Sequence, residues 1–302
     1  MAVIAIFGPS ASGKTAVAEA LAERIPAELV SADAMQAYRG LPILTNQSSA
    51  PARLVGIWPL NHEGSVGEYG ALAHAAIDEI LAAGRTPIVA GGTGLYLRAA
   101  LADLRLPPRP GGREPWGQLY DERGGGAAHE RLAELDPAAA ALVHPNDRRR
   151  VVRALELAAA GESLAPERDR LWSEETRHPT LVVGLDVPRE ELDRRIELRT
   201  AAMFEAGVVD EAQRALAGPV SETAGKTLGL EEAASLPPEE ARAAIVVRTR
   251  RYAAYQRKWM RRIPGLVTVR ADRPAGEIAD DVLEVARTRQ YLPAAGGRAA
   301  RS

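Results

Sequence analysis

The strongest constraint on the fold of this chain is the stretch GPSASGKT at residues 8–15, which directly follows the apolar run AVIAIF. It satisfies the spacing G-x-x-x-x-G-K-[ST] between a strand and a helix, the setting in which this pattern holds phosphate. The glycines let backbone N–H groups face an anion, and the helix N-terminus adds partial positive charge. We therefore expect Lys14 to contact phosphates and Thr15 to hold Mg²⁺. The whole predicted phosphate loop comprises Gly8, Pro9, Ser10, Ala11, Ser12, Gly13, Lys14 and Thr15.

Alternating strand and helix patterns place this loop in an α/β layer. Short apolar runs predict buried strands, and apolar residues at helical spacing predict the helices between them. The order strand, helix, strand, helix, strand implies a parallel sheet. Strands are expected at residues 2–7, 27–33, 86–92, 180–187 and 266–272, and the first two helices at 14–25 and 68–84.

The composition of the sequence and its pattern of strands change from about residue 107. The stretches LPPRPGGREPWG and ERGGGAAHE are rich in Pro and Gly, residues 149–161 have a helical pattern, and no strand pattern occurs over 107–179. We therefore predict an α/β fold, with a P-loop NTPase-like parallel sheet core and an inserted all-helical domain. The predicted core comprises residues 1–106 and 180–290, and the predicted insertion comprises residues 107–179. Within the core we expect helices over 189–262, with breaks near Gly218 and Pro237. Residues 291–302 are expected to be a disordered tail.

Composition limits the compartment and the partners. No apolar stretch approaches the roughly 20 residues that a membrane span needs, and the N-terminus lacks the pattern of a signal peptide. The chain has no cysteine, which excludes disulfides and thiolate metal sites, and we expect a cytoplasmic protein without a membrane partner. The net charge of −2 means that any nucleic-acid site must be a local patch.

Two further motifs end at the same predicted edge of the sheet. Asp33 closes the second strand in SADAMQAYRG, and ligands bind at the carboxyl ends of parallel strands. Its carboxylate could ligate Mg²⁺, act as a general base, or cap the next helix. GGTGLY ends the third strand, and Thr93 could reach the same site or belong to a plain turn between strand and helix.

Taken together, the motifs resemble the tRNA dimethylallyltransferase family, also called tRNA isopentenyltransferases, in its bacterial form. The resemblance covers residues 1 to about 265 and rests on order and spacing. The matching stretches are GPSASGKT, SADAMQAYRG, SVGEY, GGTGLYL, DRRRVVRALELAAAGESL, MFEAGVVDEAQRAL, KTLGLEEA and RRYAAYQRKWMRR.

The resemblance implies a reaction and roles for single residues. Members of the family transfer a dimethylallyl group from its diphosphate to the exocyclic amine of the adenosine 3′-adjacent to the anticodon, so the diphosphate is a leaving group. Asp33 matches the family's general base, Thr93 a threonine near the amine, and Arg199 an arginine that reaches the diphosphate. The stretch that matches a contact with the target nucleotide comprises Asp33, Ala34, Met35 and Gln36. The sequence departs from the family pattern at Leu44, Gln47, Arg53 and Leu230.

Two basic clusters are candidates for binding the tRNA anticodon stem-loop. The segment 248–262 contains no acid and interleaves aromatic residues with Arg and Lys, and 148–153 forms a second cluster. Either could instead be a solvated helix face. The residues expected to contact tRNA are Gln256, Arg257, Lys258, Trp259 and Arg261, with Arg113, Arg149, Arg150 and Arg153 in the insertion.

Three other functions remain open from the sequence. A small-molecule kinase would explain the phosphate loop and Asp33 but would not need the basic segment. A related adenylate isopentenyltransferase would act on a free nucleotide. A non-enzymatic P-loop protein would bind RNA in a nucleotide-dependent way without transferring a group. For the favoured reading we expect a monomer that uses tRNA, dimethylallyl diphosphate and Mg²⁺.

Overall fold

The computed structural model describes residues 2–104, 113–165, 171 and 173–292. Its contacts divide the chain into two compact units, Met1–Asp103 with Leu171–Ser302, and Leu104–Arg170. Residues 171–179, which the sequence analysis assigns to the insertion, therefore belong with the first unit. The reason is local bonding: the Arg98 guanidinium donates to the Ser173 carbonyl oxygen at 2.9 Å, and the Arg177 N–H donates to the Leu101 oxygen at 2.8 Å.

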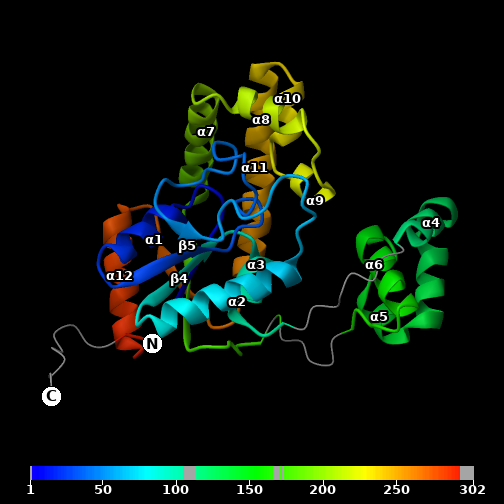
Figure 1. The fold of residues 1–302 in the computed structure, drawn as a ribbon, viewed down its shortest axis with the longest axis horizontal. Helices are drawn as coiled ribbons and strands as arrows, with labels where there is room; N and C mark the ends of the chain where they lie inside the picture. Colours follow the sequence, from blue (N-terminus) through cyan, green and yellow to red (C-terminus); the bar gives the residue numbers. More distant parts are fainter. Residues whose placement is uncertain (1, 105–112, 166–170, 172, 293–302) are drawn as a thin grey trace. The chain divides into compact units, whose positions relative to one another are not determined.

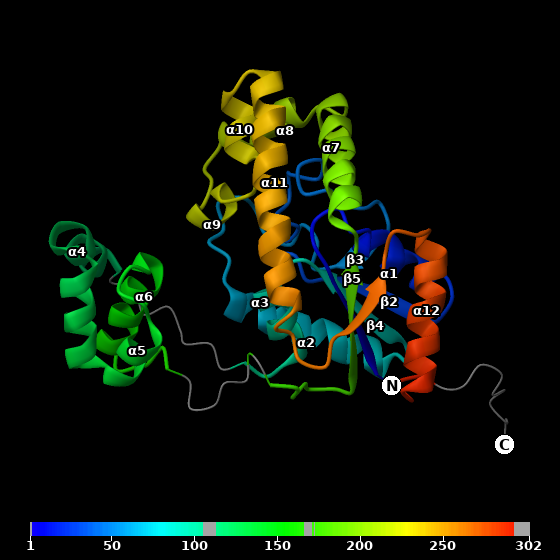
Figure 2. The same ribbon diagram turned by 180° about the vertical axis from the view of Figure 1, so that it is seen from behind.

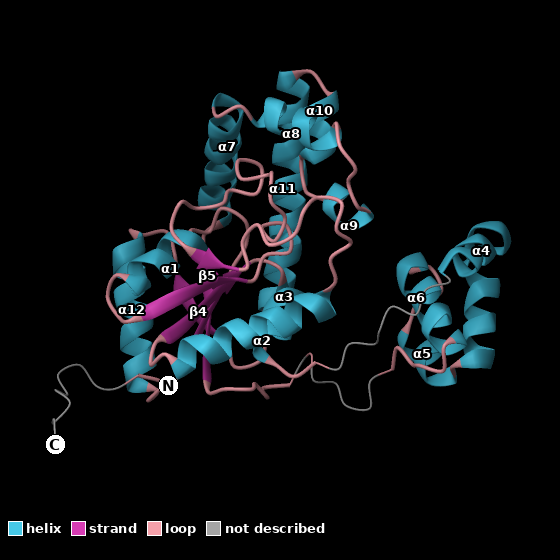
Figure 3. Ribbon diagram, viewed as in Figure 1, coloured by secondary structure: helices cyan, strands magenta, loops and turns pink. Residues whose placement is uncertain are grey.

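The first unit is built on a six-stranded parallel sheet with the order β3-β2-β4-β1-β5-β6 (Figures 1 and 3). The strands are β1 (Val3–Phe7), β2 (Ala27–Ser31), β3 (Ala52–Arg53), β4 (Thr86–Gly91), β5 (Thr180–Asp186) and β6 (Val267–Arg270). All the strand pairs are parallel, which confirms the predicted α/β class. Only the two-residue β3 was not predicted, because it is too short to show a period.

Helices cover the sheet on both faces (Figures 1 and 2). Helices α1 (Lys14–Ala22) and α12 (Ala275–Thr288) pack together over β1 and β5, where Ile4, Leu21 and Val282 share one buried cluster. Helices α2 (Val66–Ala82) and α3 (Gly94–Leu101) pack together and contact β4 on the opposite face of the sheet from α1 and α12. Burial of β1 on both faces fixes the position of the phosphate loop that follows it.

A group of helices stands above the carboxyl ends of the strands, and α7 and α11 lie side by side in it (Figures 1 and 2). The group comprises α7 (Arg189–Glu205), α8 (Val208–Leu216), α9 (Glu222–Gly225), α10 (Leu230–Ser235) and α11 (Pro238–Met260). The predicted breaks near Gly218 and Pro237 are present, and a further break occurs at Gly207, whose φ of 90° ends α7. A second buried cluster joins Leu44 from the sheet domain to Met203, Leu230 and Ile245 of this group.

The described part of the second unit consists of α4 (Arg113–Leu135), α5 (Pro137–Leu142) and α6 (Arg148–Ala159). Gly124, with φ 81°, interrupts α4. Leu132 and Leu155 pack in the core of this unit.

The prediction of a disordered tail is wrong for its first two residues. Tyr291 and Leu292 donate their N–H groups to the Ala286 oxygen and pack on the core below α12. The remainder of the predicted tail, 293–302, lies outside the described residues. In the part of the chain that the structure describes, no helix combines the length and the apolar character that crossing a membrane requires.

Candidate active site

The phosphate loop connects β1 to α1 and is shaped by its own backbone. Gly13 has φ 89° and forms the N-cap of α1, a conformation that favours glycine. The Pro9 oxygen accepts hydrogen bonds from the Ser12 N–H at 3.1 Å and from the Lys14 ammonium at 2.8 Å. The loop is therefore closed on itself, with the start of α1 facing the space above the sheet.

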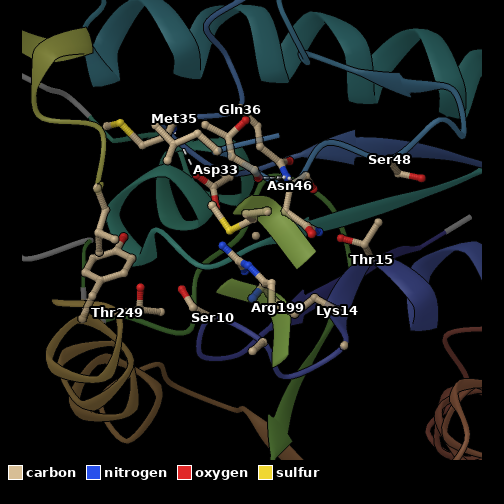
Figure 4. Close-up of a pocket in the computed structure, with 18 of the residues that line it drawn as sticks. Ser10, Lys14, Thr15, Asp33, Met35, Gln36, Asn46, Ser48, Arg199 and Thr249 are labelled. Atoms are coloured by element: carbon tan, nitrogen blue, oxygen red, sulfur yellow. Dashed lines mark hydrogen bonds between the residues drawn. The ribbon is translucent and has the colours of Figure 1, made fainter. Parts of the chain in front are cut away.

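A cavity of about 490 Å³ lies at the carboxyl ends of the strands (Figure 4). The sequence analysis assigned fourteen residues to the diphosphate, the reaction or the target nucleotide, and nine of them line the cavity. Those that line it are Ser10, Ala11, Gly13, Lys14, Thr15, Asp33, Met35, Gln36 and Arg199. Gly8, Pro9, Ser12, Ala34 and Thr93 are not among the lining residues, and the Ser12 side chain is buried.

Two cations face one carboxylate inside the cavity. Arg199 extends from α7 toward Asp33, and Lys14 lies next to Arg199 (Figure 4). Burial lowers the pKa of Lys14 to about 8, and the nearby Asp33 carboxylate only partly offsets that effect. Burial also lowers the pKa of Arg199, again against the attraction of Asp33. Both shifts show that the cavity holds positive charge away from water, where an anionic ligand would be strongly attracted.

Asp33 and Thr93 are tied to the same turn. The Asp33 carboxylate accepts a hydrogen bond from the Met35 N–H at 3.0 Å, and residues 34–37 form a turn, so Asp33 does not cap a helix. The Thr93 hydroxyl accepts from the Ala34 N–H at 3.3 Å and also bonds to the Tyr252 hydroxyl. The turn after β2 and the turn after β4 are therefore fastened together beside the cavity.

The sequence analysis did not identify Tyr252 as a site residue. It lines the cavity from α11, and burial together with the Asp33 charge raises its pKa to about 12, with the Thr93 bond opposing. The only signal in the sequence is its helical spacing from Ile245 and Thr249, which line the same cavity.

The apolar wall of the cavity was also missed, because its residues come from four separate segments. The wall comprises Met35, Leu44, Met203, Leu228 and Ile245. The loop that carries Leu44 is held by the buried Glu211 carboxylate, which accepts from the N–H groups of Ile43 at 2.9 Å and Leu44 at 2.8 Å.

The departures from the family pattern all have internal contacts. Gln47 donates to the Tyr38 oxygen at 3.2 Å and to the Thr45 hydroxyl at 3.1 Å, and so stabilises the same loop. Arg53 bonds to Glu28 at 2.8 Å at the edge of the sheet, and Leu230 is fully buried. Only Leu44 among the four lines the cavity.

Two residues that we predicted to contact tRNA pack against the turn after β4: Gln256 is buried, and Trp259 is partly buried. Gln256 is 2% exposed; its side-chain oxygen accepts from the Ser10 N–H at 2.7 Å, and its amide donates to the Gly92 oxygen at 2.9 Å. The prediction of a direct tRNA contact is therefore wrong for Gln256. The Trp259 ring packs against Gly94, where an added Cβ would lie 2.2 Å from it, and a Cβ at Gly92 would lie 2.3 Å from the Gln256 amide nitrogen. These contacts explain two glycines of GGTGLY, since larger residues would collide with α11.

The predicted basic residues divide into paired and unpaired groups. The Arg257 guanidinium bonds to the Val187 oxygen and lies 3.5 Å from the Asp186 carboxylate. Lys258 and Arg261 are exposed and take part in no ion pair among the described residues. Arg257 is thus held inward by β5, whereas its two neighbours are available to a ligand.

The cluster in the second unit is also partly paired. Arg153 bonds to the buried Glu156 at 2.8 Å, and Arg150 lies 3.7 Å from Asp147. Arg149 is exposed, and within the described part of the chain no ion pair includes it. The side chain of Arg113 lies outside the described residues, although its backbone begins α4.

With this geometry in place, comparisons with known proteins identify the family. The IPP transferase family model matches residues 36–263, and the isopentenyl transferase model matches residues 1–54. A tRNA dimethylallyltransferase from Streptomyces coelicolor is 41% identical over 87% of this chain and 88% of its own length. The chain belongs to the tRNA dimethylallyltransferase family. A second member, from an Anaeromyxobacter species, is 41% identical over 94% of this chain and 98% of its own length.

Solved structures agree with the family assignment. The tRNA isopentenylpyrophosphate transferase of Bacillus halodurans has a TM-score of 0.67 at 30% identity, over 96% of this chain and 99% of that one. A eukaryotic dimethylallyltransferase acting on tRNA has a TM-score of 0.77 over 98% of this chain and 81% of its own; at 22% identity it supports the fold alone. The family resemblance seen in the motifs is therefore confirmed.

Proposed function

We propose that this chain transfers a dimethylallyl group from dimethylallyl diphosphate to the exocyclic amine of the adenosine 3′-adjacent to the anticodon in tRNA, releasing diphosphate. The observation that carries the proposal is one cavity with two kinds of wall. Lys14 and Arg199 supply positive charge for a diphosphate, and the apolar wall accommodates a short hydrocarbon. The Asp33 carboxylate lines the same cavity near Lys14, and we propose that the acceptor amine lies beside it.

The cations act on the leaving group. The transfer breaks the bond between the dimethylallyl carbon and the diphosphate oxygen, and the electron pair leaves with the diphosphate. Lys14 and Arg199 lie beside the position where this negative charge develops, so they stabilise the transition state more than the bound substrate. The N-terminus of α1 adds partial positive charge at the same position.

Asp33 acts on the acceptor. Forming the new carbon–nitrogen bond requires the adenine amine to lose one proton, and the Asp33 carboxylate accepts it as a general base. Thr93 is held in place by the Ala34 N–H and the Tyr252 hydroxyl, so its oxygen is fixed beside this carboxylate. We propose that Thr93 orients the amine, with Met35 and Gln36 in contact with the target nucleotide.

A divalent cation fits the same cavity. Mg²⁺ binds oxygen ligands and keeps several waters, so it needs only one or two protein ligands besides the substrate phosphates. The Thr15 hydroxyl lines the cavity beside Lys14 and is the ligand we propose, with Asp33 on the same cavity. When bound, Mg²⁺ would neutralise part of the diphosphate charge. No cluster of three or more His, Asp or Glu side chains suited to a metal occurs in the described ranges.

The apolar wall favours a prenyl donor over the substrates of a small-molecule kinase. A kinase must bind the polar ribose and phosphates of a nucleotide, whereas the side chains of Leu228 and Ile245 carry no polar atom. We further propose that the chain works as a monomer in the cytoplasm, where its lack of cysteine has no cost.

Transfer of label tests the function. The full chain is incubated with radiolabelled dimethylallyl diphosphate, Mg²⁺ and one acceptor at a time: tRNA, tRNA with guanosine at the target position, AMP, or ATP. Label in intact tRNA alone supports the proposal, and label in AMP or ATP would instead identify an adenylate isopentenyltransferase. Absence of label with every acceptor, in a folded protein that hydrolyses ATP, would favour a switch protein.

A further inference from the structure

Helix α11 presents two adjacent faces, and only one of them belongs to the cavity. Ile245, Thr249 and Tyr252 line the cavity at intervals of three and four residues, and the buried Gln256 continues this row. A second row of side chains repeats the same spacing six residues further along and lies about one third of a turn around the helix from the first. That row consists of Arg251, Tyr255 and Lys258, all exposed, and is called the outer row below.

Tyr255 is the unusual member of the outer row. Its side chain is 54% exposed, although a ring of this size normally gains stability by burial. Its neighbours along the row are cations, and no acidic residue occurs between Arg248 and Arg262. Arg251 and Lys258 take part in no ion pair within the described residues. The ring is therefore presented to solvent inside a positive surface.

The ring of Tyr255 is also connected to the cavity. It stacks on Tyr252 with ring centroids 6.4 Å apart and planes inclined by 25°. On its other side Trp259 meets it edge-on, with centroids 6.5 Å apart and an angle of 69°. Tyr252 in turn lines the cavity and bonds to Thr93. Tyr255 thus lies one ring away from the place where the target base would react.

We propose that Tyr255 is a stacking site for the nucleobase next to the target adenosine. The inference rests on the proposed function, because it is the entry of one base into the cavity that brings its neighbour to α11. A target base must leave its stack to reach an enclosed carbon, and its neighbour then loses a stacking partner. An exposed aromatic face replaces that partner, and Arg251 and Lys258 on either side contact the phosphates of the same strand.

The alternative is a purely structural role, in which Tyr255 only shields Tyr252 and Trp259 from water. The two roles differ in what they require of the ring. Shielding needs apolar bulk, which a leucine supplies, whereas stacking needs a flat π face. Stacking also differs from a phosphate contact, because loss of a stacked base weakens binding without changing its dependence on salt.

The test uses an anticodon stem-loop RNA with 2-aminopurine placed 5′ or 3′ of the target adenosine. The variants are Tyr255→Phe, Tyr255→Leu and Tyr255→Ala, with Lys258→Ala as the phosphate-contact comparison. Val247→Ala is the matched control, since Val247 is an exposed residue of the same helix that lies two turns before Tyr255. Affinity is measured across a salt series, and circular dichroism reports folding.

We expect the wild type and Tyr255→Phe to change the 2-aminopurine fluorescence at one of the two positions. Tyr255→Leu should lose that change and bind RNA about 5- to 150-fold more weakly, with an unaltered salt slope. Lys258→Ala should keep the fluorescence change and reduce the salt slope by up to about one unit. Wild-type affinity and fluorescence in Tyr255→Leu would overturn the stacking site, and they would do so even while prenyl transfer to tRNA proceeds. Failure of the wild type to transfer the group would instead refute the proposed function.

Discussion

Replacing Gln256 with alanine should destabilise the first unit and distort the phosphate loop together. Gln256 lies at the centre of three elements: α11, which carries it, the loop at Ser10 and the turn at Gly92. The same side chain accepts from the Ser10 N–H and donates to the Gly92 oxygen, and it is almost fully buried. No other described side chain bonds to these two backbone groups.

The magnitude follows from what the substitution leaves unpaired. The buried Gly92 oxygen would lose its donor, which costs about 1–3 kcal/mol. The Ser10 N–H borders the cavity and can reach water, so its loss costs about 0.5–1.5 kcal/mol. Together they cost about 1.5–4.5 kcal/mol. In a unit of this size each kcal/mol lowers Tm by about 2–4 °C, which predicts a fall of about 3–18 °C.

Thermal unfolding followed by circular dichroism measures this loss, and steady-state kinetics measures the effect on the loop. Because Ser10 lines the cavity floor, KM for dimethylallyl diphosphate should rise in the variant. Lys258→Ala, two residues along the helix and exposed, is the matched control and should unfold like the wild type. Equal Tm and equal KM in Gln256→Ala and wild type would refute the view that this side chain holds the loop to α11.

Three further predictions concern the cavity and its rim. Asp33→Asn should lower kcat by about 10²–10⁴-fold while tRNA affinity measured by filter binding stays near wild type; normal turnover at saturating substrates would remove Asp33 from the mechanism. Lys14, with a pKa of about 8, is charged below that pH and neutral above it, so log kcat/KM for dimethylallyl diphosphate should fall with a slope near −1 above about pH 8. In Lys14→Arg that fall should move to higher pH, and an unmoved fall would assign it to another group. Arg257→Ala should lower Tm but leave the salt slope of tRNA binding unchanged, because Asp186 and Val187 already hold the guanidinium; a flatter slope would restore Arg257 to the RNA surface.

Local patterns were sufficient for much of the fold. The phosphate loop and the strands around it could be predicted because each is a contiguous signal: an apolar run followed by turn residues at fixed spacing. Asp33 could be placed at the same edge as Lys14 because parallel strands share their carboxyl ends. These inferences need the order of elements but not the packing of one element on another.

The apolar wall and the loop support depend on that packing. Leu44 and Met203 lie far apart in the sequence and meet only because α7 stands above the sheet. The sequence pattern predicts that Glu211 is an exposed acidic residue on an amphipathic helix. In the structure it is buried, and its carboxylate accepts hydrogen bonds from the N–H groups of Ile43 and Leu44. Sequence periodicity gives the phase of a helix, but it does not identify the neighbour that the helix faces.

The burial of Gln256 and the ion pair of Arg257 show why a dense basic segment overstates an RNA surface. Seven Arg and Lys residues between 248 and 262 suggest a uniform positive helix. In the structure, three of the seven face acidic residues of neighbouring elements. Arg248 pairs with Glu232, Arg250 with Glu197 and Arg257 with Asp186. A paired guanidinium adds little to the field outside the protein, since the two charges cancel at distances beyond their separation. The charge left for tRNA lies at Arg251, Lys258 and Arg261, beside Tyr255, the most exposed ring of that helix. Because the acids that neutralise the other arginines come from α7, α10 and β5, the packing of these elements on α11 decides where an RNA strand can approach, and it leaves that approach next to the cavity.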